Sequence, residues 1–283
     1  MTKPVRPPAS ERVLTRYVNA FARRNDTDVS RVRRLISFMA LAGALRQATR
    51  HVDGVPAFVV KGGVALELRM RDRARATRDL DLILNRDLGD PLAALEDLLV
   101  EPYEGFAFRR KGEEYRMPNG AVRVKVQVSF QGREWGTVEV DLANREGETE
   151  VELVPGIPLL EEFGIAGPEE IECLSLRHHV AQKLHAVTRP MPDGRQNDRF
   201  RDLVDLLLLR QFVHDHAAVA SACAEVFSRR GTHPWPPVII PPDEWRQPFA
   251  RMADETGLPV REIDTAVAEI SDWIAQIAGA TPS

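Results

Sequence analysis

Residues 58–84 read FVVKGGVALELRMRDRARATRDLDLIL, and this stretch decides the fold. It opens with β-branched and aromatic residues that stop at Gly62 and Gly63, a pattern typical of a buried strand entering a tight turn. Residues 64–70 then favour a helix. From residue 79 to residue 84 carboxylate and aliphatic side chains alternate, which is the period of a strand with one wet face and one buried face.

The composition is ordinary for a soluble globular protein. The chain has 283 residues, enough for one large or two modest domains, with 43% hydrophobic and 28% charged residues. Its formal net charge of −4 argues against nonspecific coating of DNA, although it permits a local basic groove. No N-terminal apolar segment and no run near the roughly 18 apolar residues of a membrane span occur, so we expect a cytoplasmic protein.

The order of elements predicts two domains. Two helical patterns precede the quoted stretch, and a helix near 91–100 and strands near 105–111, 122–130 and 136–144 follow it. Residues 153–170, rich in Pro and Gly, are interpreted as the join to a helical region. We therefore predict an α/β (α+β) fold, with a mixed-sheet domain and its N-terminal helices over residues 1–165 and a helical domain over residues 166–283.

The two glycines after the first strand form a candidate phosphate-binding turn. A strand, Gly62, Gly63 and a helix place unhindered backbone N–H groups at a helix N-terminus, which favours an anion such as a triphosphate. The same pattern is common in proteins, and tight packing at a turn would explain the glycines as well.

Asp79 and Asp81 are candidate metal ligands, because side chains two apart on a strand leave the same face. Neighbouring carboxylates repel one another unless a positive charge lies between them, and Mg²⁺ takes hard oxygen ligands. An exposed acidic strand face is the alternative. A later strand offers Asp141 as a third carboxylate, with Glu139 as its rival, and could complete a two-metal site if the two strands are neighbours. We prefer Asp141 because apolar residues flank it as they flank Asp81.

Four motifs together resemble the nucleotidyltransferase-like toxins of the AbiEii/AbiGii type, within the polymerase-β-like nucleotidyltransferase superfamily. They are KGGVALEL (61–68), RATRDLDLIL (75–84), QKLHAVTR (182–189) and RFRDLVDLLLL (199–209). The resemblance covers roughly residues 55–210 and is closest to the MenT toxins, in which segments like HPWPP (233–237) also occur.

The resemblance implies a nucleotidyltransferase core that uses Mg²⁺ or Mn²⁺ and a nucleoside triphosphate. It further implies tRNA as the acceptor, modified at its 3′ end so that it cannot be charged, and a cognate antitoxin protein as a partner. The expected catalytic residues are Asp79, Asp81, Lys183 and Asp205; the nucleotide-binding residues are Lys61, Gly62, Gly63 and Arg75; the metal ligands are Asp79, Asp81 and Asp141.

Lys183 also has an interpretation of its own. Its helix carries apolar residues toward the core, and an ammonium group beside carboxylates and a triphosphate would neutralise developing charge. A snorkelling surface lysine is the alternative. Asp202 and Asp205 lie three apart on the next helix, so either could orient Lys183, and the resemblance favours Asp205.

Other polar residues lie near these motifs. Val64 replaces the Ser or Thr that often follows the glycine pair in the family, so the backbone alone must hold phosphate there. A phosphate or nucleotide added to Thr77 would place negative charge beside the metal pair and block it. His178 and His185 share a helix face, but no further zinc ligands occur at recognisable spacing. We expect two or three of the flanking arginines to track an RNA backbone: Arg75, Arg78, Arg189, Arg195, Arg199 and Arg201.

The sequence thus predicts the toxin of a toxin–antitoxin system that adds nucleotides to the 3′ end of tRNA. Transfer of a nucleotide to a protein or small-molecule hydroxyl is one alternative. A noncatalytic toxin that binds nucleotide or RNA is the other, and its toxicity would survive Asp79→Ala.

Overall fold

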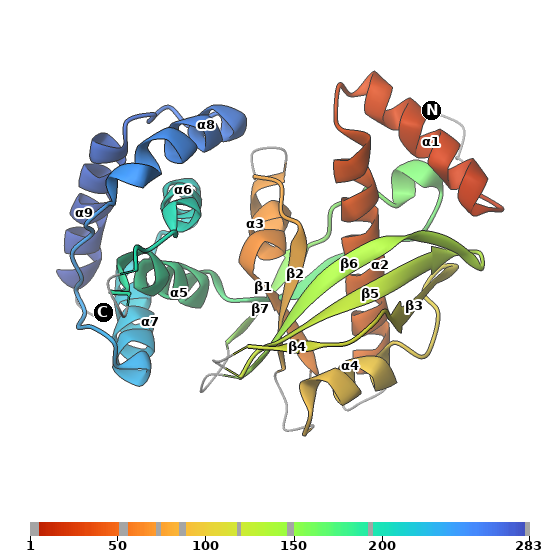
Figure 1. The fold of residues 1–283 in the computed structure, drawn as a ribbon, viewed down its shortest axis with the longest axis horizontal. Coiled ribbons are helices and arrows are strands. Elements are labelled where there is room, and N and C mark those ends of the chain that lie inside the picture. Colours follow the sequence, from red (N-terminus) through yellow and green to blue (C-terminus); the bar gives the residue numbers. More distant parts are fainter. Residues whose placement is uncertain are drawn as a thin grey trace. The chain divides into compact units, whose positions relative to one another are not determined.

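The computed structural model describes residues 6–50, 56–71, 75–84, 89–117, 120–145, 150–191 and 195–280. They form two compact units, and each is described by itself (Figure 1). The first unit comprises Met1–Arg71 and Ala76–Leu174, and the second comprises Asp72–Arg75 and Ser175–Ser283.

The helices are α1 (Glu11–Arg24), α2 (Val29–Arg50), α3 (Gly62–Met70), α4 (Pro91–Leu98), α5 (Leu176–Thr188), α6 (Phe200–Leu209), α7 (His216–Arg230), α8 (Arg246–Thr256) and α9 (Ile263–Ala278). The strands are β1 (Phe58–Lys61), β2 (Asp79–Leu84), β3 (Phe106–Arg110), β4 (Tyr115–Arg116), β5 (Val122–Phe130), β6 (Arg133–Asn144), β7 (Val151–Pro155) and β8 (Glu170–Leu174). Short 3₁₀ turns lie at Glu161–Phe163, Arg210–Phe212 and Asp243–Trp245.

The strands form one mixed sheet in the order β3-β5-β6-β2-β1-β8-β7, with β4 paired to β5. Strands β2 and β6 are parallel, as are β1 and β8, while the other pairs are antiparallel. Parallel pairs need long connections, and several elements lie between the partners in the chain: α4 to β5 between β2 and β6, and α3 to β7 between β1 and β8. The predicted mixed-sheet fold class is confirmed.

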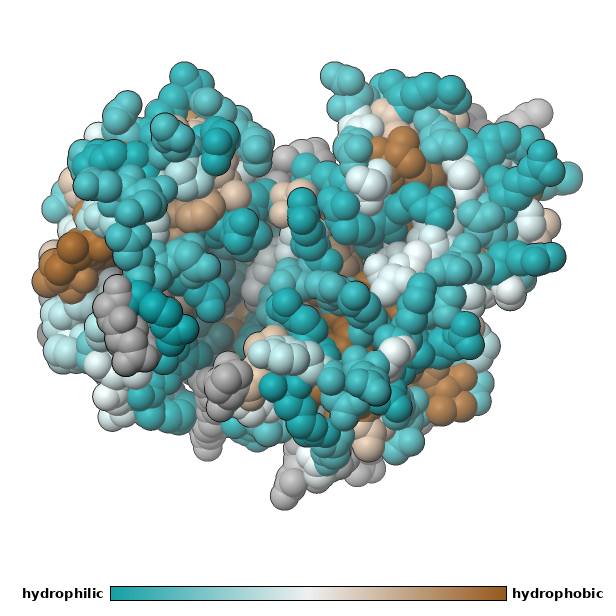
Figure 2. Space-filling model, viewed as in Figure 1, coloured by the Kyte–Doolittle hydropathy of each residue, from teal (hydrophilic) through white to brown (hydrophobic). Residues whose placement is uncertain are grey.

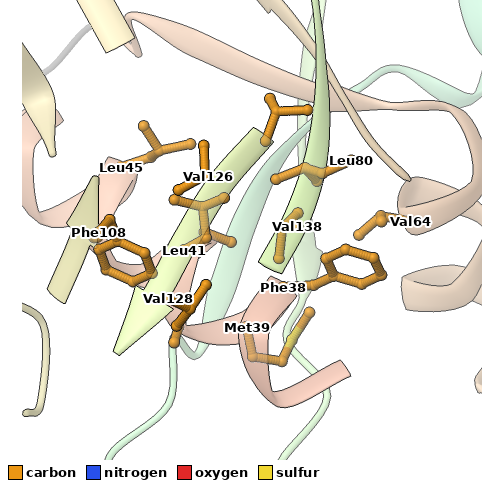
Figure 3. Packing of buried hydrophobic residues seen from close by; sticks show 14 of the residues in the cluster. Phe38, Met39, Leu41, Leu45, Val64, Leu80, Phe108, Val126, Val128 and Val138 are labelled. Carbon is orange, nitrogen blue, oxygen red and sulfur yellow. The ribbon is translucent and has the colours of Figure 1, made fainter. Parts of the chain in front are cut away.

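One face of the sheet carries the main core of the first unit. In β2, Leu80 and Leu82 alternate with Asp79 and Asp81, and both leucines are buried. Figure 3 shows this packing, in which apolar side chains of helix α2 meet those of the strands. The residues labelled there are Phe38, Met39, Leu41, Leu45, Val64, Leu80, Phe108, Val126, Val128 and Val138. Burial of one face therefore places Asp79 and Asp81 on the opposite face, where Ile83 at the end of β2 packs in a small separate cluster with Val59 and Leu174.

The N-terminal helices are fastened to the sheet by polar contacts as well as by the core. Ser10 caps α1, because its Oγ accepts a hydrogen bond from the backbone N–H of Val13. In α2, the Arg33 guanidinium lies 3.7 Å from the centre of the Trp135 ring and donates a hydrogen bond to the Trp135 carbonyl oxygen. This stacked cation ties α2 to β6.

The interpretation of residues 153–170 as a join between domains is wrong. This segment contains buried Leu160 and Phe163, which belong to the core of the first unit, and β8 after it adds a strand beside β1. The backbone N–H of Gly156 donates to the Glu169 carbonyl oxygen at 2.8 Å, so the Pro and Gly residues form a turn within the unit. The first unit consequently continues to Leu174 rather than ending at residue 165.

The second unit contains the helices α5 to α9. Helix α5 packs against α6 and α7, and α9 packs against α6, α7 and α8.

Figure 2 shows mostly hydrophilic residues on the face of the chain that is in view. Within the described residues, no helix has both the length and the apolarity needed to cross a membrane.

Candidate active site

The turn between β1 and α3 is shaped by side chains that pack against its two glycines. Gly62 has a φ of +61°, and a Cβ added to it would lie 2.6 Å from the Cγ of Asp81 and closer still to its Oδ2. A Cβ on Gly63 would lie 2.6 Å from the Cβ of Thr77. Glycine is therefore required at both positions by local packing, whether or not their N–H groups also bind phosphate.

Asp79 and Asp81 lie beside the acidic residues of β6. In the parallel pairing of β2 with β6, Asp81 stands opposite Asp141 and Asp79 stands opposite Glu139. Residues directly opposite one another share a face of the sheet, so all four carboxylates lie on the face that the main core leaves uncovered. The strand adjacency on which the choice of Asp141 depended is present in the structure.

Basic residues flank the acidic ones on both sides. Lys61 of β1 stands opposite Asp81, Arg123 of β5 stands opposite Asp141, and Lys125 stands opposite Glu139. The order across the sheet is thus Lys61, Asp81, Asp141, Arg123, a row in which two carboxylates lie between two cations. We call this arrangement the charged row.

Arg123, which no sequence motif singled out, makes the best-defined contact of the charged row. Its Nε and Nη2 donate to Oδ1 and Oδ2 of Asp141, both at 2.7 Å, and its Nη2 lies 3.9 Å from Oδ2 of Asp79. Hydrogen bonding to Asp141 raises the pKa of Arg123 above its ordinary value. The alternation of residues 122–130 places Arg123 on the polar face of β5, but only the strand register identifies its partner.

Asp79 and Asp81 have the donor chemistry of a magnesium site, whereas Asp141 is engaged elsewhere. The Thr77 hydroxyl, which is buried, donates to Oδ1 of Asp79 at 2.9 Å and so holds that carboxylate. Mg²⁺ is commonly held by one or two carboxylates with water and substrate phosphates. Among the residues that the structure describes, no group of three or more His, Cys, Asp and Glu side chains is arranged to hold a metal ion. Asp79, Asp81 and Asp141 thus stay the predicted metal ligands, and in the structure both oxygens of Asp141 are bound by Arg123.

Lys183 lies in a buried ion network within the second unit. Its Nζ donates to Asp205 at 2.6 Å and to Asp202 at 2.9 Å, and its side chain is only 7% exposed. A surface position for Lys183 is therefore excluded. Arg75 completes the network through Nε and Nη2, each 2.9 Å from an oxygen of Asp205. Asp205, which is fully buried, thus binds two cations, whereas Asp202 binds Lys183 and the exposed Arg199.

Each charge in this network stabilises the ionised form of its partners. Burial alone would lower the pKa of Lys183, but the carboxylates of Asp202 and Asp205 outweigh it, and the pKa is raised. Burial alone would raise the pKa of Asp205, but the charges of Lys183 and Arg75 outweigh it, and the pKa is lowered. Both groups are thus ionised near neutral pH. The Arg75 guanidinium, predicted to bind nucleotide, is held at two points by Asp205.

The remaining predicted residues take ordinary positions. Val64 is completely buried in the core, so an aliphatic side chain suits the position after the glycines. His178 contacts Ser175 and Glu225, while His185 contacts Thr232, so the structure gives these histidines different partners and the described residues hold no zinc cluster. The exposed arginines predicted to track RNA are Arg78, Arg189, Arg195, Arg199 and Arg201.

Comparison with known proteins places the chain in a family. The sequence model of the nucleotidyl transferase AbiEii toxin, type IV toxin–antitoxin system, matches residues 44–269. The fold is similar to MenT4, a nucleotidyltransferase toxin from Mycobacterium tuberculosis H37Rv, with a TM-score of 0.53 and 18% identity over 85% of this chain and 82% of that one. No curated protein has a significantly similar sequence.

Two further solved structures have lower scores. One is an antigenic nucleotidyltransferase-like protein from Paracoccidioides brasiliensis, with a TM-score of 0.40 and 15% identity over 68% of this chain and 89% of that one. The other is the antibiotic-resistance factor ANT(2'')-Ia, with a TM-score of 0.38 and 15% identity over 69% of this chain and 94% of that one. The family match covers most of the sequence, and the predicted resemblance is confirmed. The chain belongs to the AbiEii family of nucleotidyltransferase toxins of toxin–antitoxin systems.

Proposed function

We propose that this chain transfers nucleotides from a nucleoside triphosphate to the 3′ end of tRNA in a reaction that requires Mg²⁺ or Mn²⁺. Blocking that end prevents aminoacylation and so stops translation, and a cognate antitoxin protein restrains the activity. The observation that carries the proposal is the Asp79–Asp81 pair beside the glycine turn, on the face of the sheet opposite the main core, in a chain of this nucleotidyltransferase family.

Asp79 and Asp81 would hold the metal ion. The ion, when bound, neutralises triphosphate charge and polarises the phosphorus that is attacked. Thr77 fixes the orientation of Asp79 through its hydrogen bond, and Gly62 leaves room for the Asp81 carboxylate. The backbone N–H groups of the first turn of α3 have no partners within the helix, so they suit phosphate oxygens, with Lys61 opposite Asp81 as a nearby cation.

The reaction is an in-line substitution at the α-phosphorus. The oxygen of the acceptor hydroxyl forms a bond to that phosphorus, the bond to the bridging oxygen breaks, and pyrophosphate leaves while the hydroxyl proton is released. Lys183 and Asp205, which the family resemblance adds to the catalytic set, are ionised at neutral pH and able to supply fixed charge.

The test is a transfer assay that separates the possible acceptors. The purified chain is incubated with total tRNA, Mg²⁺ and each α-labelled nucleoside triphosphate in turn, and the label on RNA and on protein is read separately. We expect label on RNA that is abolished by a chelator, reduced at least a hundredfold by Asp79→Asn or Asp81→Asn, and unchanged by the matched variant Glu134→Gln. Glu134 is an exposed carboxylate of β6 that pairs with Lys111.

Each alternative predicts another result. Label on protein alone would move the acceptor to a side chain. Absence of label, together with growth arrest that persists in Asp79→Ala, would make nucleotide or RNA binding the function of the chain. The expected cytoplasmic location and the antitoxin partner are checked separately, by fractionation of cells and by co-purification.

A further inference from the structure

The polar face of the sheet carries four carboxylates, Asp79 and Asp81 on β2 and Glu139 and Asp141 on β6, and the two strands hold them by different contacts. On β6, Asp141 is bound at two points by Arg123, and Glu139 lies 3.9 Å from Nζ of Lys125. Strand β5 thus supplies one cation for each carboxylate of β6. The carboxylates of β2 face a different environment, with the Thr77 hydroxyl on Asp79 and the glycine turn against Asp81.

The Arg123–Asp141 pair makes Asp141 a poor metal ligand. Both oxygens of Asp141 accept short hydrogen bonds from the guanidinium, in the two-point geometry that gives the strongest carboxylate pairs. A divalent ion bound to Asp141 would have to displace that guanidinium or lie directly beside its positive charge. The side chain of Asp141 is also only 16% exposed, which leaves little room for a metal ion and its other ligands.

Arg123 retains the means to bind an anion. A guanidinium group has five N–H donors, and Asp141 uses two of them. The Arg123 side chain is 41% exposed, and its Nη2 reaches to 3.9 Å from Asp79. Because Asp141 holds it at two points, the guanidinium is presented beside the metal pair in a fixed orientation, which is the arrangement that suits recognition of phosphate.

We propose that the site binds one divalent metal ion per chain, on Asp79 and Asp81, and that Arg123 provides the second positive charge by contacting a phosphate oxygen of the nucleotide. Asp141 is then a positioning residue that acts through Arg123. This inference rests on the proposed function, since it specifies how the same site receives the triphosphate. It replaces the expected set of three carboxylates for two ions with two carboxylates, one ion and one arginine.

Counting bound ions tests the inference without relying on turnover. Mn²⁺ binding is measured by electron paramagnetic resonance of the free ion, with the full chain alone and with α,β-methylene analogues of the four ribonucleoside triphosphates. We expect one ion per chain in both states, and loss of that ion in Asp79→Asn. Asp141→Asn should keep the ion and weaken binding of the analogue about tenfold.

Arg123 variants separate phosphate binding from a structural role. Arg123→Gln should weaken the analogue at least tenfold while Mn²⁺ binds as tightly as before or more tightly, because a positive charge near Asp79 has been removed. Arg123→Lys should restore part of the affinity for the analogue. The double variant Arg123→Gln/Asp141→Asn replaces the ion pair by neutral side chains of similar size, and its unfolding transition shows whether the fold is retained.

Two ions per chain, one of which is lost in Asp141→Asn, would overturn the inference, and so would unchanged analogue binding in Arg123→Gln. Failure of the proposed function gives a different result: one ion and normal analogue binding with no label transferred to RNA. A chain that binds no Mn²⁺ would contradict both.

Discussion

Gly62 and Asp81 are in such close contact that no side chain can replace the hydrogen of the glycine without moving the carboxylate. The contact connects the turn after β1 with the centre of β2, two segments that the sequence presents as separate motifs. The glycine pair and the acidic pair are therefore in direct contact, and a substitution in one pair should change the geometry of the other.

Gly62→Ala tests this coupling. The left-handed backbone at Gly62 and the overlap with Asp81 should together lower the free energy of unfolding by about 2–5 kcal/mol. Affinity for Mn²⁺ should fall at least tenfold, because the carboxylate is displaced. Gly132→Ala is the matched control, since Gly132 has a φ of +71° and a Cβ there would have open space. Gly132→Ala should lower the free energy of unfolding by about 1–2 kcal/mol and leave the affinity for Mn²⁺ unchanged. Equal Mn²⁺ affinities in the two variants would show that the contact is unimportant.

Gly63→Ala should disturb Asp79 by an indirect route. The new methyl group would push against Thr77, whose hydroxyl holds the Asp79 carboxylate. We expect transfer activity to fall at least tenfold. Gly136→Ala, on an open part of β6, is the control and should retain wild-type activity. Thr77→Val, which replaces the hydroxyl by a methyl group of similar size, should reproduce the loss. Full activity in Thr77→Val would mean that this hydrogen bond does not orient Asp79.

Asp205→Asn should destabilise the second unit strongly. The substitution leaves the buried charge of Lys183 and the half-buried charge of Arg75 incompletely paired, and breaking such a pair typically costs about 3–5 kcal/mol. Denaturant unfolding monitored by circular dichroism measures the loss. Asp202→Asn is the comparison, and should destabilise the unit less, because Asp202 pairs with Lys183 and with the exposed Arg199, whereas Asp205 pairs with Lys183 and the half-buried Arg75. Similar losses in both variants would contradict the central place of Asp205 in the network.

The same network should give a defined dependence of stability on pH. The pKa of Asp205 is lowered on folding, so its contribution is complete above the ordinary carboxyl pKa of about 4 and is lost as the pH falls through the folded value. The pKa of Lys183 is raised, so its contribution is complete below its ordinary pKa and is lost as the pH rises through the folded value. The stability difference between wild type and Asp205→Asn should thus be constant between about pH 5 and 9 and shrink below about pH 4. A difference that changes across neutral pH would contradict this assignment.

Local patterns in the sequence were sufficient to predict much of the first unit. The alternation in β2, β5 and β6 identified these strands and their polar faces, because a strand with one buried face must alternate. Strands β7 and β8 were missed, since they are short and lie among Pro and Gly residues that also indicate linkers. The sequence also predicts the tight turn at Gly62, but it does not indicate that the Asp81 side chain is what requires glycine there.

The partners of the charged residues could not be predicted in the same way. Which carboxylate faces Asp81, and which cation faces Asp141, depends on the register between strands distant in the chain. Likewise a lysine on a helix is usually exposed, and only the packing of α5 against α6 shows that Lys183 is buried between two carboxylates. The sequence pattern thus shows on which face of a strand or helix a side chain lies, whereas its charged partner is known only from the folded structure.

The most direct test of the proposed activity is the mass of the 3′-terminal fragment of tRNA after incubation with the chain, Mg²⁺ and the nucleoside triphosphate that labels RNA. We expect the mass to increase by one or more whole nucleoside monophosphates, added at the 3′ hydroxyl only. We expect no increase with tRNA whose terminal ribose has been oxidised by periodate, or with the Asp79→Asn variant. An unchanged 3′ fragment in a preparation of the wild-type chain that binds Mn²⁺ and nucleotide would contradict it.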